Sequence, residues 1–246
     1  MKKLLLVFML LCTLLSCSKK SKTSTIANSQ LPPFKIVVLE DFSGSTKREN
    51  KVDMQTLFYL ADSVAHYGGV LAYGTIINNS DIPLIELYIA EPPQPTTAQM
   101  EKNPFKKESK AKQVANSEAA KDAAKIRQID CDNKIATFLN LVEKRRKKTK
   151  TAQFSDVSGA LERAEQIVCA PNSFSRAPRT LVVVCSDLQH DFIGGNRERW
   201  TGFSCPLYKP MLVVGAQNSG NLNIKQSDFA NFTSFDEAIR YIFINK

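Results

Sequence analysis

Residues 36–46 read IVVLEDFSGST, an apolar run followed by an aspartate, a glycine and two serines. The β-branched apolar run is typical of a strand that is buried on both faces of a parallel sheet. Asp, Ser and Gly favour turns, so a plain turn is the simplest interpretation of the residues that follow. Asp41, Ser43 and Ser45, however, place an oxygen ligand at every second residue, and a loop of this kind can wrap a hard cation. The rest of the chain has to decide between a turn and a metal site.

Outward from this stretch, strand patterns and helix patterns alternate along the chain. Short apolar or β-branched runs predict further strands at residues 70–77, 84–90, 180–185 and 211–215. Apolar residues at helical spacing predict helices at residues 52–67, 156–168 and 235–244. The first two of these further strands are separated by a polar turn, which predicts a hairpin. The order predicts a three-layer, Rossmann-like α/β sandwich whose sheet is mostly parallel, with one antiparallel hairpin strand.

A long basic insertion interrupts this alternation at about residues 98–150. Residues 106–148 contain no Pro or Gly, so we expect a long helix there. Residues 101–150 hold 15 Lys and Arg against 7 Asp and Glu, which accounts for most of the net charge of +9. This charge can belong to a solvated helix face, or it can bind anionic lipid headgroups or an acidic protein. An apolar stripe in the second half is expected to pack on the core: Ile126, Ile129, Ile135, Phe138, Leu139 and Val142.

The N-terminal segment predicts export and lipid anchoring. Residues 1–16 have a basic start and an apolar stretch that is too short for a permanent transmembrane helix and fits a signal peptide. The sequence LLSC, which ends at Cys17, resembles the lipobox of bacterial lipoproteins, and this implies lipid attachment to Cys17. An ordinary signal peptide with an incidental cysteine is the alternative. Residues 17–33 predict a flexible polar tether, and residues 34–246 predict the folded domain.

A lipid anchor of this kind implies a position in the cell envelope of a bacterium. Ser18, directly after the anchored cysteine, resembles the sorting signal for the outer membrane, so we expect the domain to face the periplasm. A nucleic-acid partner is not expected, because a signal peptide exports the chain away from nucleic acid.

Two further segments carry oxygen ligands that extend the pattern of the first loop. Ser155 precedes the helix predicted at residues 156–168, and Asp187 follows the strand predicted at residues 180–185. Open α/β sheets bind their ligands at the carboxyl ends of strands. Together with the first loop, these segments resemble the von Willebrand factor type A domain and its metal-ion-dependent adhesion site. The resemblance covers about residues 34–246.

The resemblance implies a role for each of these residues. Ser43 and Ser45 would bind a divalent cation directly, whereas Asp41 and Asp187 would act mainly through water. Ser155 stands where the family has a threonine. Hydroxyl and carboxylate oxygens suit Mg²⁺, with Mn²⁺ or Ca²⁺ as alternatives. An open ligand position on the cation would accept a carboxylate from an acidic residue of a protein partner.

We therefore expect a lipid-anchored, extracytoplasmic module that binds a protein partner through a divalent cation and is not an enzyme. One alternative is a metal-independent scaffold protein of the cell envelope with the same fold. The other is a metal-dependent phosphoesterase, in which His190 and Asp191 would help a metal ion to activate water. The sequence has no P-loop or nucleophile elbow that would support an enzyme.

The cysteines of the predicted domain suggest one disulfide. Cys131 and Cys169 lie about equally far from a turn near residue 151, so two antiparallel helices would bring their thiols level. An oxidising compartment would let these thiols pair. The pairing is a hypothesis, because connectivity cannot be deduced from spacing alone. Cys185 is expected to be a small core residue, and Cys205 lies in the long connection before the last predicted strand.

Overall fold

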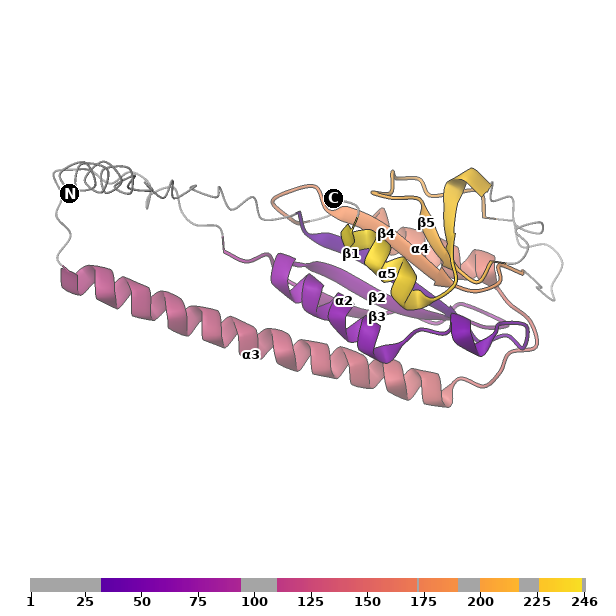
Figure 1. Cartoon of the computed structure of the whole chain (residues 1–246), viewed down its shortest axis with the longest axis horizontal. Coiled ribbons are helices and arrows are strands. Elements are labelled where there is room, and N and C mark those ends of the chain that lie inside the picture. Colours follow the sequence, from indigo (N-terminus) through magenta and orange to yellow (C-terminus); the bar gives the residue numbers. More distant parts are fainter. Residues whose placement is uncertain (1–31, 94–109, 172, 190–199, 217–225, 245–246) are drawn as a thin grey trace, which may run out of the picture. The chain divides into compact units, whose positions relative to one another are not determined.

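A six-stranded sheet forms the centre of the computed structural model, which describes residues 32–93, 110–171, 173–189, 200–216 and 226–244 (Figure 1). The strands are β1 (Phe34–Asp41), β2 (Gly69–Ile76), β3 (Ile85–Ile89), β4 (Arg179–Cys185), β5 (Met211–Val214) and β6 (Phe229–Phe232). Their order is β3-β2-β1-β4-β5-β6. Neighbouring strands are parallel except for β2 and β3, which are antiparallel. The mostly parallel sheet with one hairpin strand is thereby confirmed, and β6 is a strand that the sequence did not predict.

Helices cover both faces of this sheet. They are α2 (Met54–Tyr67), α3 (Lys110–Lys148), α4 (Val157–Val168) and α5 (Phe235–Ile244). Short 3₁₀ helices occur at Arg48–Asn50 and Gln226–Asp228. Helices α2, α3 and α5 share one apolar cluster with the sheet, and α4 belongs to the cluster on the other face. The described residues thus form a three-layer α/β structure. No helix in this part of the chain is long and apolar enough to cross a membrane.

Strand β1 is buried along its whole length, as its composition predicts. Ile36 and Val38 face the layer of α2, α3 and α5, whereas Val37 and Leu39 face α4. These side chains are fully buried, and burying an aliphatic side chain of this size stabilises a protein by about 1.5–3 kcal/mol. Strand β1 therefore gives a rigid base to the loop that begins at its last residue, Asp41.

The folded domain begins slightly earlier than the sequence predicts. Residues from Pro32 onward belong to one compact unit. The backbone N–H of Arg179 donates to the carbonyl of Pro33 over 2.8 Å, and the Arg179 guanidinium donates to the carbonyl of Pro32 over 3.3 Å. Two residues of the tether predicted at 17–33 are therefore part of the domain.

Several predictions fall outside the described residues. They concern the signal peptide at residues 1–16, the lipid attachment at Cys17, and the first part of the insertion, residues 98–109. His190 and Asp191, the residues on which the enzyme alternative depends, also lie outside them.

Helix α3 packs against α2 and β3 with one face of its C-terminal half. The prediction for this half is confirmed at Ile135, Phe138 and Val142, which are buried, and Leu139 packs against the same cluster. It is wrong at Ile126 and Ile129, whose side chains are 69% and 52% exposed.

The buried face of α3 follows a different register before Ile135. It continues through the buried Cys131 to the half-buried Arg127, at steps of four residues, which keeps it on one side of the helix. The Arg127 guanidinium donates hydrogen bonds to the carbonyls of Ala65 and Ala90, over 3.1 and 3.0 Å. Ile126 and Ile129 lie off this line, so they point away from the core.

A buried carboxylate fastens the C-terminal end of α3 to the sheet. Glu40, on β1, is fully buried, and two nitrogens of the Arg146 guanidinium each lie 3.0 Å from one of its oxygens. The hydroxyl of Tyr73 and the backbone N–H of Val52 also donate to this carboxylate. These donors compensate the cost of burying the charge. Burial, followed by the charge of Glu40, raises the pKa of Tyr73 far above its ordinary value.

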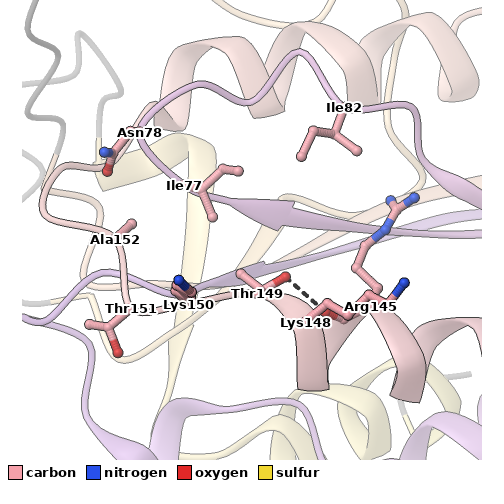
Figure 2. A pocket seen from close by; sticks show the side chains of 9 residues that line it. All are labelled: Ile77, Asn78, Ile82, Arg145, Lys148, Thr149, Lys150, Thr151 and Ala152. Atoms are coloured by element: carbon pink, nitrogen blue, oxygen red, sulfur yellow. Dashed lines mark hydrogen bonds between the residues drawn. The ribbon is translucent and has the colours of Figure 1, made fainter.

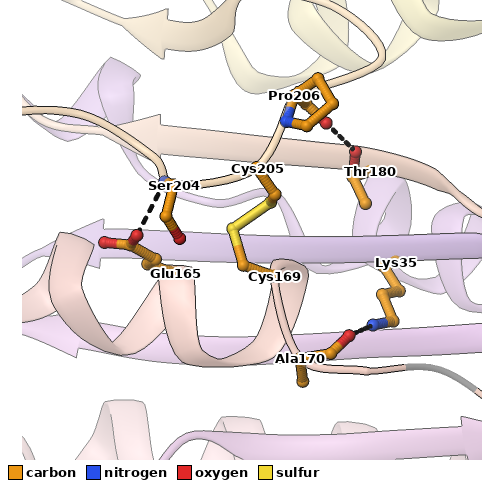
Figure 3. The surroundings of a disulfide bond; sticks show 8 residues. All are labelled: Lys35, Glu165, Cys169, Ala170, Thr180, Ser204, Cys205 and Pro206. Carbon is orange, nitrogen blue, oxygen red and sulfur yellow. Dashed lines mark hydrogen bonds between the residues drawn. A yellow bond between two sulfur atoms is a disulfide. The ribbon is translucent and has the colours of Figure 1, made fainter.

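The disulfide of the structure joins Cys169 to Cys205, with 5.4 Å between the Cα atoms (Figure 3). Cys169 caps the C-terminus of α4, and Cys205 lies on the connection between β4 and β5. Two hydrogen bonds hold this connection beside the disulfide. The Ser204 N–H donates to Glu165 over 2.8 Å, and the Thr180 hydroxyl donates to the carbonyl of Pro206 over 3.0 Å.

The predicted pairing of Cys131 with Cys169 is therefore wrong. Cys131 is a free, buried thiol in the cluster beneath α3, whereas Cys169 lies beside the cluster beneath α4. The sheet separates these two clusters, so the two helices do not form the antiparallel pair that would bring the thiols level. Cys185 is a fully buried core residue, as predicted, and burial raises the pKa of its thiol.

Candidate functional site

Three segments that are distant in sequence meet at the carboxylate of Asp41. This residue ends β1 and is fully buried. The hydroxyl of Ser186, just after β4, donates to Oδ2 over 2.7 Å. The hydroxyl of Ser155, just before α4, lies 3.3 Å from Oδ1. The backbone N–H of Ser43 donates to Oδ1 over 2.8 Å. We call Asp41, Ser43, Ser45, Ser155 and Ser186 the oxygen cluster.

The loop after β1 contributes hydroxyl groups to this cluster. The Oγ of Ser43 lies 3.0 Å from the Oγ of Ser45 and 3.1 Å from the Oγ1 of Thr46. Ser43 and Thr46 are buried, while Ser45 is exposed to solvent. The predicted loop ligands thus lie within hydrogen-bonding distance of one another, and Ser45 is the member that faces outward.

Backbone pairing brings the segment that contains Ser155 beside the loop after β1. The N–H of Ala152 donates to the carbonyl of Phe42 over 2.8 Å, and the N–H of Gly44 donates to the carbonyl of Ala152 over 3.3 Å. Ser155 follows three residues later, which is close enough for its hydroxyl to reach Asp41. The sequence shows both segments, but it does not show this pairing.

Asp156 fixes the start of α4 and so the position of Ser155. Its carboxylate accepts hydrogen bonds from the N–H groups of Gly159 and Ser80, each over 3.0 Å. The hydroxyl of Ser80 donates in return to the carbonyl of Asp156 over 2.9 Å. An aspartate at the helix N-cap that accepts from the third helical residue is a strong start signal for a helix. Asp156 is thus a structural neighbour of the oxygen cluster.

Asp187 lies next to the oxygen cluster, and its carboxylate bonds elsewhere. It is buried, and its Oδ1 accepts a hydrogen bond from the N–H of Gln189 over 3.0 Å. Leu188 adopts a positive φ of 61°, and its N–H donates to the hydroxyl of Ser186 over 3.0 Å. This tight turn holds Ser186 against Asp41. Among the described residues, no hydrogen bond joins Asp187 to the other predicted ligands.

A lysine that the sequence analysis missed lies beside the cluster. The ammonium of Lys51 donates to the backbone carbonyl of Asp41 and lies 4.5 Å from the centre of the Phe42 ring. Burial lowers the pKa of Lys51, while the negative charges of Glu40 and Asp41 oppose this shift. The lysine places a positive charge near two buried carboxylates. No motif marks it, because it lies ten residues after Asp41 in a polar stretch.

Ser186 is the second residue to which the sequence analysis assigned no role. It stands directly before the predicted ligand Asp187, at the end of a strand, and this position was the available signal. Its hydroxyl makes the shortest hydrogen bond that a side chain donates to Asp41.

The chemistry of the oxygen cluster fits a hard cation, and it also fits a purely structural role. Its side chains offer only carboxylate and hydroxyl oxygens, which suit Mg²⁺, Mn²⁺ or Ca²⁺. In the described part of the chain, no group of three or more His, Cys, Asp or Glu residues is placed to hold a metal ion. A cation would therefore depend on the serine hydroxyls. Asp41 already accepts from one N–H and two hydroxyls, so it is satisfied without a metal.

Comparison of the chain with protein-family models, curated proteins and solved structures gave no match. The resemblance to the von Willebrand factor type A domain therefore stays a prediction from the residues quoted above.

Proposed function

We propose that the protein is a von Willebrand factor type A-like module that binds a protein partner through a divalent cation held at the oxygen cluster and Asp187. The observation that carries this proposal is the meeting of three segments at Asp41. The hydroxyls of Ser155 and Ser186 lie 3.3 and 2.7 Å from its carboxylate oxygens.

The position of the cluster in the sheet supports a binding role. The chain builds β1, β2 and β3 toward one edge, and then β4, β5 and β6 toward the other. The direction therefore reverses between β1 and β4. Asp41 ends β1 and Ser186 follows β4, so both lie at the carboxyl ends of the strands that flank the reversal. Open α/β sheets bind ligands in the crevice at this point.

The chemistry of the cluster supports a cation with an open ligand position. Ser43 and Ser45 would hold the ion directly, Ser155 would join them, and Asp41 and Asp187 would hold its water ligands. Because the hydroxyls are neutral, the bound ion would keep much of its charge. A carboxylate of the partner would complete its coordination. Ser45 is exposed to solvent, so an ion that it held would be open to a carboxylate of the partner.

We further propose that Cys17 carries a lipid that anchors the domain to a bacterial membrane, with the domain facing the periplasm. The support for this is the sequence of residues 1–17. Residues 18–31 would then connect the anchor to the domain, which begins at Pro32.

One observation favours a metal-independent scaffold as the second candidate. Asp41 is fully buried and its hydrogen bonds are complete, as expected of a group that joins three loops for stability alone. In that case, removal of divalent cations would leave partner binding unchanged.

A pull-down from bacterial membranes with the full-length chain separates the two candidates. The cation-dependent function predicts that EDTA releases the partner and that added Mg²⁺, Mn²⁺ or Ca²⁺ restores it. Ser45→Ala should weaken capture, while Ser63→Ala should not. Ser63 is a matched control, because its hydroxyl bonds to the carbonyl of Tyr59 on α2. Capture that is insensitive to both EDTA and Ser45→Ala would support the scaffold.

A further inference from the structure

A cavity of about 480 Å³ lies between the β2–β3 connection and the C-terminal end of α3 (Figure 2). One wall contains Ile77, Asn78 and Ile82, and Arg145 together with residues 148–152 forms the other. Its volume is within the range of pockets that hold small ligands or peptide side chains. We call it the basic pocket, because Arg145, Lys148 and Lys150 line it together with Thr149, Thr151 and Ala152.

In the part of the chain that the structure describes, two basic residues next to the pocket form ion pairs, whereas the basic residues that line it do not. Arg146 pairs with Glu40, and Lys147 pairs with Glu143. Among the described residues, Arg145, Lys148 and Lys150 form no ion pair with a carboxylate. Among the described residues that line the pocket, none has an acidic side chain. Three positive charges that pair with no carboxylate of the described residues therefore line the cavity, while Lys144, on the same end of α3, lies outside it.

Compensation of the helix dipole explains part of this arrangement. Cations at the last turn of a helix interact favourably with its C-terminal carbonyls. This accounts for Lys148, which ends α3, but Lys150 lies beyond the helix. It also does not explain why Ile82 leaves 42% of its surface exposed beside these cations.

Arg145 is held in place and is partly desolvated. Its guanidinium donates to the carbonyl of Pro83 over 2.6 Å, and this bond ties α3 to the segment that leads into β3. The hydroxyl of Thr149 donates to the Arg145 carbonyl over 2.9 Å, which fixes the end of the helix. Burial lowers the pKa of Arg145. A fixed, partly desolvated cation loses little freedom when an anion binds.

The pocket also adjoins the oxygen cluster. Ala152 lines the pocket, and its backbone is hydrogen-bonded to Phe42 and Gly44 in the loop after β1. Asn78 lines the pocket as well, and its side-chain oxygen accepts from the N–H of Phe154, one residue before Ser155. A ligand in the pocket would therefore lie beside the loops of the cluster.

We propose that the basic pocket binds an acidic peptide segment that carries an apolar side chain beside its carboxylates. The cations would pair with the carboxylates, and the apolar side chain would cover Ile77 and Ile82. A free phosphate would leave these isoleucines exposed and most of the cavity unfilled, so the mixed lining favours a peptide of a protein partner. This contact needs no metal ion, and it goes beyond the cation-dependent function without resting on it.

The test measures binding of fluorescent pentapeptides to the full-length chain in EDTA, by fluorescence anisotropy. The probe alternates Glu and Leu, and two control peptides replace either every Glu by Gln or every Leu by Ala. We expect the probe to bind in EDTA and each control peptide to bind about tenfold more weakly. Binding in EDTA separates this proposal from the cation-dependent function, which would fail under the same condition.

Variants of matched charge place the binding in the pocket. Lys148→Gln with Lys150→Gln should weaken binding of the probe by about fivefold, because two exposed charges at the rim of the pocket are lost. Lys125→Gln with Lys144→Gln removes the same charge from exposed positions of α3 outside the pocket, and should leave binding unchanged. Ile82→Ser leaves the charge unchanged and should also weaken binding of the probe.

Three results would overturn the proposal. The first is that the probe does not bind at millimolar concentration. The second is that both double lysine variants weaken probe binding equally, which would show that binding depends only on the net charge of the protein. The third comes from vesicles of phosphatidylcholine and phosphatidylglycerol in equal parts. If the wild type bound the vesicles but not the probe, and the Lys148 and Lys150 variant lost vesicle binding, the pocket would be a lipid site.

Discussion

The buried ion pair of Glu40 and Arg146 shows how single residues set the arrangement around the candidate site. Glu40 precedes Asp41 on β1, so the two carboxylates belong to opposite faces of the sheet. Glu40 holds α3 on one face, and Asp41 gathers the loops of the oxygen cluster. Removing one partner of a buried pair leaves an uncompensated charge, and this costs more than the pair itself contributes.

Tyr73→Phe tests this buried pair through its pH dependence. The hydroxyl of Tyr73 donates to Glu40, so its loss should reduce the free energy of unfolding by about 1–3 kcal/mol at neutral pH. The folded state raises the pKa of Tyr73 above the ordinary value of 10.0, so its contribution is fully present below pH 10. Above pH 10 the unfolded chain releases the proton first, and the contribution is lost as pH rises.

Urea unfolding of wild type and Tyr73→Phe at neutral pH and above pH 10 measures this effect. The gap in stability between the two proteins should narrow at the higher pH. A gap that stays constant would mean that Tyr73 contributes by packing alone. Tyr59→Phe is the control, because Tyr59 is 56% exposed on α2.

The disulfide between Cys169 and Cys205 should contribute to stability. Cys205→Ser should reduce the free energy of unfolding by about 3–4 kcal/mol in the chain-entropy account, since Cys169 and Cys205 are separated by 36 residues. Peptide mapping without reduction should find these two cysteines linked, and iodoacetamide should label Cys131 only after unfolding. A linkage that includes Cys131 would contradict the structure.

The apolar pattern of helix α3 predicted its packing only in part. A stripe of apolar residues predicted that the second half of α3 packs on the core, and Ile135, Phe138 and Val142 do so. The stripe failed at Ile126 and Ile129 because Arg127 takes the buried line of the helix. The spacing of apolar residues does not show which of two neighbouring rows of side chains faces the core. An arginine in one row can face the core when it donates to backbone carbonyls there, as Arg127 does.

Two substitutions on α3 test which line is buried. Phe138→Ala should destabilise the protein by about 3–5 kcal/mol, because it leaves a cavity beneath the helix. Ile129→Ala should change stability by less than about 0.5 kcal/mol, since its side chain is already exposed. Thermal melting of both variants gives the comparison. Similar losses from the two would show that Ile129 is buried and that the described packing of α3 is wrong.

The predicted pairing of Cys131 with Cys169 was wrong because of the topology of the fold. Equal distances from a turn bring two thiols level only when the two helices pack against each other. Helices α3 and α4 instead lie on opposite faces of the sheet. The sequence contains no local signal for the face on which each helix packs.

Across the described chain, the strand patterns were sufficient to predict a mostly parallel sheet, and the motifs at the strand ends indicated which side chains form most of the oxygen cluster. Asp41, Ser43, Ser45 and Ser155 are close together in the structure because the segment before α4 pairs with the loop at the carboxyl end of β1. Lys51 and the basic pocket could not be predicted, because each depends on contacts between segments that carry no motif.

Calorimetric titration measures whether the oxygen cluster binds a divalent cation. We predict that the wild-type chain binds at least one of Mg²⁺, Mn²⁺ and Ca²⁺, and that Ser43→Ala with Ser45→Ala abolishes binding. The variant should keep the melting temperature of the metal-free wild type, because β1 and not the loop supplies the stability. If the wild-type chain bound none of the three ions at millimolar concentration, or if the variant bound as well as wild type, the oxygen cluster would not be a cation site.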